Sequence, residues 1–153
     1  MSDLMKSAGN WIRLISFLPL LLVAEANGAQ EDSLTLTVHA SGAKPGVGQA
    51  LFSLFDSRKT FLKTPMVSLE LPIDDAGGAV FKVEGLKPGV YAVTVIYDED
   101  NSGDLNTGFL GIPTEKVGMS NNPTSRFGPP GFRKASFEFT DSQVLDIFLQ
   151  GVK

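Results

Sequence analysis

The strongest constraint on the fold is a series of short runs in which apolar and polar residues alternate. Residues 34–40, Leu-Thr-Leu-Thr-Val-His-Ala, show this period of two, which is typical of a strand with one buried face. Turn clusters separate the runs, and the 153-residue chain contains 16 glycines and 9 prolines. No segment has an apolar stripe with the 3.6-residue period of a helix over more than about two turns. The pattern therefore predicts an all-β protein rather than a βαβ fold.

Seven segments have the length and composition of strands. They are residues 34–40, 50–55, 67–71, 79–83, 90–97, 135–139 and 144–149. Their spacing predicts a seven-stranded antiparallel Greek-key β-sandwich, immunoglobulin-like or prealbumin-like, formed by residues 34–150 as a single domain. The stretch between Tyr97 and Phe132 has little strand character, so we expect one long loop there, and loops of that length are usually functional.

One turn provides further evidence for a sandwich. The run Gly85–Tyr91 places Pro88 and Gly89 where a type II turn requires them, with the glycine supplying a positive φ. Tyr91 follows this turn, as in a tyrosine corner, where the hydroxyl ties the start of a strand to the preceding turn. The alternative is that Tyr91 simply packs in the core. Both interpretations favour a sandwich.

The N-terminus has the pattern of a secretory signal peptide. Lys6 and Arg13 precede an uncharged run over residues 14–24, which is too short for the roughly 20 residues of a membrane-spanning helix. Small residues follow at 24–29, so we expect a signal peptide over residues 1–29, cleaved between 26 and 30, and a short mature tail over 30–33. The mature protein would be periplasmic or secreted, without a transmembrane anchor. A buried N-terminal helix or an uncleaved anchor is the alternative.

The composition excludes several kinds of chemistry. The chain has no cysteine, which excludes a disulfide scaffold, a zinc-thiolate site and a thiol nucleophile. Its net charge of −4 argues against nucleic acid as a partner, because phosphates require a basic surface. His39 is the single histidine, and no nucleophile elbow, zinc-binding helix motif or phosphate-binding glycine loop occurs. We therefore expect a protein that is not an enzyme and has no catalytic residues.

An acidic run after the strand at 90–97 has the spacing of a calcium loop. The candidate metal ligands are Asp98, Asp100, Ser102, Asp104 and Asn106. Calcium takes six to eight oxygens, and alternate residues of a curled loop can point them inward when a glycine, here Gly103, permits the reversal. Phe109 stands where an EF-hand has its bidentate glutamate, so a carbonyl, water or a distant carboxylate such as Glu115 would complete the shell. A solvated acidic turn that caps its own backbone is the alternative.

Aromatic residues among glycines and prolines follow this acidic run. They occur in the segments 108–113 and 127–132. Such residues can line a ligand groove, or they can hold a long loop against a sheet edge and cover its unpaired backbone groups. We favour the second interpretation.

The ordered motifs resemble a known family. Tyr97–Asn106, Phe109–Pro113, Ser120–Asn122 and Gly128–Pro130 together look like the bacterial exported family named domain of unknown function 2141. The likeness extends from Leu34 to Leu149. It implies an exported β-sandwich similar in build to transthyretin-like and carboxypeptidase-regulatory-like modules, and it implies no activity.

Three functional hypotheses follow. We favour an exported, non-enzymatic module that binds a small ligand or an envelope protein through the 98–131 loop, with calcium (Ca²⁺) ordering that loop if the site forms. The second hypothesis is a purely structural accessory subunit of an envelope assembly. The third is a hydrolase that uses the loop carboxylates.

Overall fold

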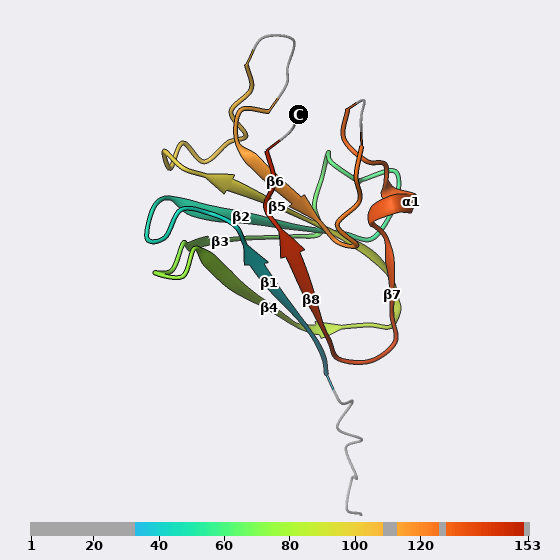
Figure 1. The fold of residues 1–153 in the computed structure, drawn as a ribbon. Helices are drawn as coiled ribbons and strands as arrows, with labels where there is room; N and C mark the ends of the chain where they lie inside the picture. The colour runs from blue at the N-terminus through green and yellow to red at the C-terminus, as the bar shows by residue number, and fades with distance from the viewer. Residues whose placement is uncertain (1–32, 109–112, 126–127, 152–153) are drawn as a thin grey trace, which may run out of the picture. The chain divides into compact units, whose positions relative to one another are not determined.

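The computed structural model describes residues 33–108, 113–125 and 128–151, which form eight strands and one short helix (Figure 1). The elements are β1 (Leu34–Ser41), β2 (Gln49–Phe55), β3 (Val67–Pro72), β4 (Gly78–Leu86), β5 (Gly89–Asp98), β6 (Lys116–Met119), α1 (Phe132–Ala135), β7 (Phe137–Phe139) and β8 (Gln143–Phe148). The predicted signal peptide over 1–29 lies outside the described residues. No helix in the described ranges is long and apolar enough to cross a membrane.

The strands form two sheets with a common core. The smaller sheet has the order β4-β1-β8, and the larger has the order β3-β2-β5-β6, with β7 also paired to β5. Leu36 and Val38 of β1 lie in one buried cluster with Val93 and Val95 of β5, because alternate side chains of each strand face the opposite sheet. The chain is therefore all-β, as the alternation predicts.

The predicted seven-stranded antiparallel topology differs from the structure in three places. The described residues contain eight strands, because β6 lies in the stretch expected to be one long loop. The pair β1–β8 is parallel, so the sandwich is not purely antiparallel. The segment predicted as a strand over 135–139 begins in α1 and becomes the strand β7 only at Phe137. The seven-stranded Greek-key prediction is therefore not confirmed.

The strand β6 depends on a contact that no local pattern reveals. It pairs with β5 over only four residues, from Lys116 to Met119. A Cβ atom on Gly118 would lie 2.5 Å from Cγ2 of Ile147 and 3.0 Å from the carbonyl oxygen of Phe148. Glycine therefore lets β6 approach β8, which belongs to the other sheet.

The tyrosine corner at the start of β5 is confirmed. The Tyr91 hydroxyl donates a hydrogen bond of 3.0 Å to the carbonyl oxygen of Lys87, while its ring is buried and packs edge-on against Phe139. The prediction of a positive φ at Gly89 is wrong, since Gly89 is not among the residues with that conformation. A Cβ at Gly89 would lie 3.2 Å from Cε2 of Tyr91. Glycine there makes room for the ring.

We expect Tyr91→Phe to lower the free energy of unfolding by about 1 kcal/mol, because it leaves the Lys87 carbonyl without this hydrogen bond. Urea unfolding measures the change. Tyr97→Phe is the matched control, since the buried Tyr97 hydroxyl has no hydrogen-bond partner among the described residues. Its removal should leave stability unchanged or raise it. Equal losses in the two variants would contradict this prediction.

Candidate metal centre

The site begins with Asp98, the last residue of β5. Its side chain is fully buried and lies on the face of the larger sheet opposite to Tyr97, which faces the core. Oδ2 of Asp98 accepts hydrogen bonds of 2.8 Å from Nε2 of Gln49 and from the backbone N–H of Gly103. Oδ1 accepts a bond of 3.0 Å from the backbone N–H of Ser102. Three hydrogen bonds therefore fix the position of the Asp98 carboxylate.

The register between β2 and β5 places Gln49 beside Asp98. Gln49 begins β2 and lies directly opposite Asp98 in the pairing of β2 with β5. The preceding residue, Gly48, has a φ of +73°, and a Cβ atom there would collide with the carbonyl oxygen of Asp98. Glycine at this point allows the turn into β2 to pass close to the end of β5, which brings the Gln49 amide to the carboxylate.

The acidic loop curls around Asp98 through two residues in the left-handed conformation. Asn101 has a φ of +55° and Gly103 has a φ of +84°. Asparagine and glycine tolerate this conformation best, and it turns successive backbone N–H groups to one side. Ser102 donates its N–H to Oδ1 of Asp98 at 3.0 Å and to Oδ1 of Asp100 at 3.2 Å. The backbone of the loop thus supports both carboxylates.

The pKa of Asp98 is lower than its ordinary value of 3.8. Burial raises this pKa, because it disfavours the charged form. The hydrogen bonds from Gln49 and from the backbone of Gly103 and Ser102 lower it and outweigh the burial. Asp98 is therefore a stabilised carboxylate at neutral pH.

Glu115 completes the cluster from the other end of the loop. It is buried immediately before β6, and its Oε2 accepts a hydrogen bond of 2.9 Å from the backbone N–H of Asn106. Thr114 donates its N–H to the Asn106 carbonyl at 2.9 Å, so two stretches of the loop run side by side. One carboxylate oxygen from each of Asp98, Asp100 and Glu115 lies within 4.8 Å of the others.

Asn106 lies among these oxygens. Its Nδ2 is 3.2 Å and 3.1 Å from the two carboxylate oxygens of Asp100 and 3.4 Å from Oε1 of Glu115. It is also 3.4 Å from Oγ of Ser102. An amide donor therefore occupies a position to which four oxygens point.

The structure brings most of the sequence-predicted ligands together. Asp98 and Asp100 belong to the carboxylate cluster, and Ser102 and Asn106 lie at its rim. Asp104 is exposed, and among the described residues its side chain makes no hydrogen bond or ion pair with the cluster. Its backbone carbonyl accepts a hydrogen bond of 3.2 Å from the Ser102 hydroxyl. Sequence reasoning missed Gln49, because its only signal is a register that pairs two distant strands.

No described Lys, Arg or His forms an ion pair with the clustered carboxylates. The nearby ion pair joins Lys44 to Glu99, which lies outside the cluster, and Glu99 raises the pKa of Lys44. The other described pair joins His39 to Asp146 on the smaller sheet, where the Nδ1–Oδ1 distance is 3.4 Å. Hard oxygen ligands without a protein cation suit a divalent ion such as calcium.

The fold and the site define a class of protein, an all-β domain of two packed sheets with an oxygen-rich loop at the end of one strand. The family described as an uncharacterized protein conserved in bacteria (DUF2141) matches residues 38–146. The chain belongs to this family, and the match extends from within β1 to within β8 and includes the acidic loop. No curated protein and no solved structure matches the chain.

The lowered pKa of Asp98 predicts a specific dependence of stability on pH. Because the folded pKa lies below the unfolded value, the Asp98 carboxylate stabilises the fold above a pH of about 4, and this contribution is lost as the pH falls through the folded pKa. Asp98→Asn should lower the free energy of unfolding by about 2 kcal/mol near neutral pH, the scale of hydrogen bonds to a charged group. The difference from the wild type should shrink below a pH of about 4.

Urea unfolding over a pH series in EDTA measures this difference. Glu84→Gln is the matched control, since Glu84 is exposed on β4, away from the loop. Its curve should run parallel to that of the wild type. A constant difference between Asp98→Asn and the wild type down to acidic pH would contradict the prediction.

Proposed function

We propose that the protein is an exported, non-enzymatic binding module whose 98–131 loop is ordered by calcium and contacts a small ligand or an envelope partner. The observation that supports the calcium site is the convergence of carboxylate oxygens from Asp98, Asp100 and Glu115 within 4.8 Å. Like charges at this separation repel one another unless a cation or solvent compensates them. A calcium ion provides that compensation and links the two ends of the loop.

The surrounding groups supply further oxygens for such an ion. Rotation of the Asn106 amide by a half-turn replaces Nδ2 with Oδ1 at the position facing Asp100 and Glu115. The Ser102 hydroxyl lies beside this position, and water completes the six to eight ligands that calcium takes. Without the bidentate glutamate of an EF-hand, we expect a dissociation constant on the order of 10⁻⁴ to 10⁻³ M, the range of extracellular calcium modules.

The electrostatics of the loop support binding rather than catalysis. A carboxylic acid that donates a proton near neutral pH needs a raised pKa, whereas the pKa of Asp98 is lowered. His39 is exposed on the smaller sheet and pairs with Asp146. The lowered pKa makes Asp98 a poor general acid, which supports the non-enzymatic module over a hydrolase that would use Asp98 in that role.

Export rests on the N-terminal pattern of basic, apolar and small residues over 1–29. A periplasmic or extracellular location agrees with a calcium site of modest affinity, because calcium is far more concentrated outside the cytosol than within it. We therefore place the proposed module in the envelope or in the medium.

A structural accessory subunit is the second candidate. The smaller sheet presents exposed apolar side chains on its outer face, with Val80 50%, Val144 58% and Phe148 54% exposed. These residues belong to β4 and β8, the two outer strands of that sheet. Concentration-dependent sedimentation that Phe148→Ser abolishes would favour this candidate over a monomeric binding module.

We expect millimolar calcium to raise the midpoint of thermal unfolding by several degrees relative to EDTA. Saturation at about 100 times the dissociation constant adds roughly 2.7 kcal/mol to the free energy of unfolding. Magnesium should produce a much smaller shift, because it demands a tighter octahedral geometry and gives up its water reluctantly.

Asp100→Asn and Glu115→Gln should each abolish most of the calcium-dependent shift, and Glu84→Gln should leave it intact. Differential scanning calorimetry measures the midpoints. The absence of a calcium shift, or an equal shift with magnesium, would reduce the acidic loop to a solvated turn and overturn the calcium part of the proposal.

A further inference from the structure

A second, smaller apolar cluster lies on the outer face of the larger sheet, near the beginning of β5. It contains Phe55, Phe61, Ala92, Met119 and Ala135, and Phe132 packs against it. Phe55 and Ala92 lie opposite each other in the pairing of β2 with β5. The loop between β2 and β3 and the helix α1 thus cover the sheet here, with an open cavity of about 380 Å³ between them.

The aromatic wall of this cavity is held by ring contacts. Phe61 packs edge-on against Phe55, with ring centroids 5.2 Å apart, and against Phe132, with centroids 5.6 Å apart. Phe132 therefore packs the end of the long loop over the outer face of the larger sheet rather than against a sheet edge, where the sequence interpretation placed the loop aromatics. The same ring also lines the cavity.

Polar contacts hold α1 in place beside the cavity. The buried Ser120 hydroxyl accepts a hydrogen bond of 2.9 Å from the N–H of Val93 and donates one of 2.5 Å to the carbonyl of Ala135. Nδ2 of Asn121 donates to the carbonyls of Lys134 and Ser136 at 3.2 Å and 2.8 Å. These bonds fix the helix on β5, so the cavity wall is preorganised.

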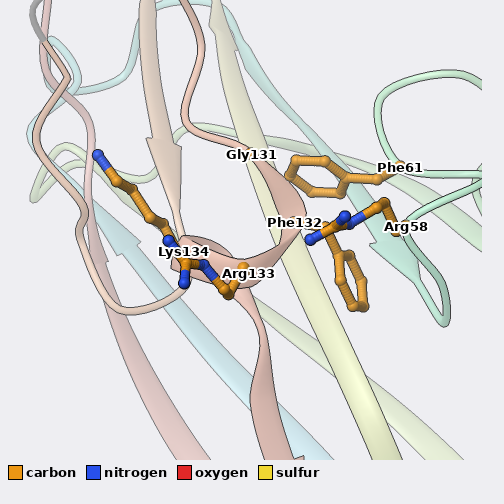
Figure 2. Close-up of a pocket in the computed structure, with 6 residues that line it drawn as sticks. All are labelled: Arg58, Phe61, Gly131, Phe132, Arg133 and Lys134. Atoms are coloured by element: carbon orange, nitrogen blue, oxygen red, sulfur yellow. The ribbon is translucent and has the colours of Figure 1, made fainter.

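The other lining residues are Gly131 and three basic residues, Arg58, Arg133 and Lys134. Figure 2 shows Arg58 beside the rings of Phe61 and Phe132, with Arg133 extending from α1 and the Lys134 amine pointing away from the two rings. No acidic side chain is among the described lining residues, and none of the three cations forms an ion pair within the described ranges. The whole chain has a net charge of −4, so the positive charge around this cavity is opposite in sign to that of the protein as a whole.

We propose that this cavity binds a small organic anion, a carboxylate or phosphate group attached to an aromatic body. The rings of Phe61 and Phe132 contact the aromatic body, and the guanidinium groups of Arg58 and Arg133 bind the anionic group. Guanidinium groups match both carboxylate and phosphate because they donate paired hydrogen bonds in one plane. The cavity is open to solvent, and its volume of about 380 Å³ leaves room for a ligand of this size.

This inference names a ligand class and a binding site that shares only Gly131 with the 98–131 loop of the proposed function. It rests on the proposal that the protein is a binding module, and it is independent of calcium, since none of the lining residues belongs to the acidic cluster. Binding of the organic anion in EDTA therefore tests this inference without calcium. The calcium proposal is tested separately by the shift in thermal unfolding.

The test is a titration of the ¹⁵N-labelled protein with phenyl phosphate and with benzoate, followed by NMR in phosphate-free buffer. We expect saturable shifts at the backbone amides of Phe61, Phe132, Arg133 and Lys134, in EDTA as well as in calcium. The stronger of the two ligands identifies the anionic group. Inorganic phosphate and neutral benzyl alcohol should each bind at least about tenfold more weakly. Phosphate lacks the aromatic body, and benzyl alcohol lacks the anionic group.

Arg58→Gln and Arg133→Gln should each weaken binding by about tenfold, the effect of losing one charge-assisted contact. Lys59→Gln is the matched control, because Lys59 is exposed beside Arg58 but does not line the cavity. All three variants alter exposed side chains, so the fold should persist. Unshifted amides, equal binding of inorganic phosphate or benzyl alcohol, or an equal loss with Lys59→Gln would overturn the inference.

Discussion

The backbone pairing of β5 is the constraint on which both candidate sites depend. β5 pairs with β2, β6 and β7, so its direction and register place three neighbouring strands. Its core-facing residues join the main cluster between the sheets. Its opposite face begins at Ala92 beside the aromatic cavity and ends at Asp98 in the acidic loop. One rigid strand therefore positions two regions of unlike chemistry.

These two regions are separated enough to act independently. Figure 1 shows α1 and the acidic loop at opposite ends of β5. The six-residue step from Ala92 to Asp98 spans about 20 Å along an extended strand. This exceeds the Debye length of about 8 Å at physiological ionic strength, so the carboxylates do not cancel the attraction of the basic cavity for an anion. An acidic protein can thus carry an acidic cluster and a basic cluster on one face, and these are the two sites proposed above.

Local features were predictable from the sequence, and features that need two distant segments were not. The alternation at 34–40, the Tyr91 corner and the clustering of Asp98 with Asp100 follow from neighbouring residues, and the structure has all three. The strand β6 was missed because its pairing with β5 depends on Gly118 fitting against Ile147. The parallel β1–β8 pair was missed because alternation reports the buried face of a strand and not its direction.

The sequence by itself determined the all-β class, the turns and the run of oxygen-bearing residues, because backbone preference and alternation act over a few neighbouring residues. Only the tertiary structure decided that Gln49 and Glu115 reach the acidic loop and that Arg58 lies near Arg133. These juxtapositions depend on the register between strands and on which loop covers which face of the sheet. The physical reason is that packing energy is shared by residues far apart in the chain, and no short segment contains the information that selects among its possible partners.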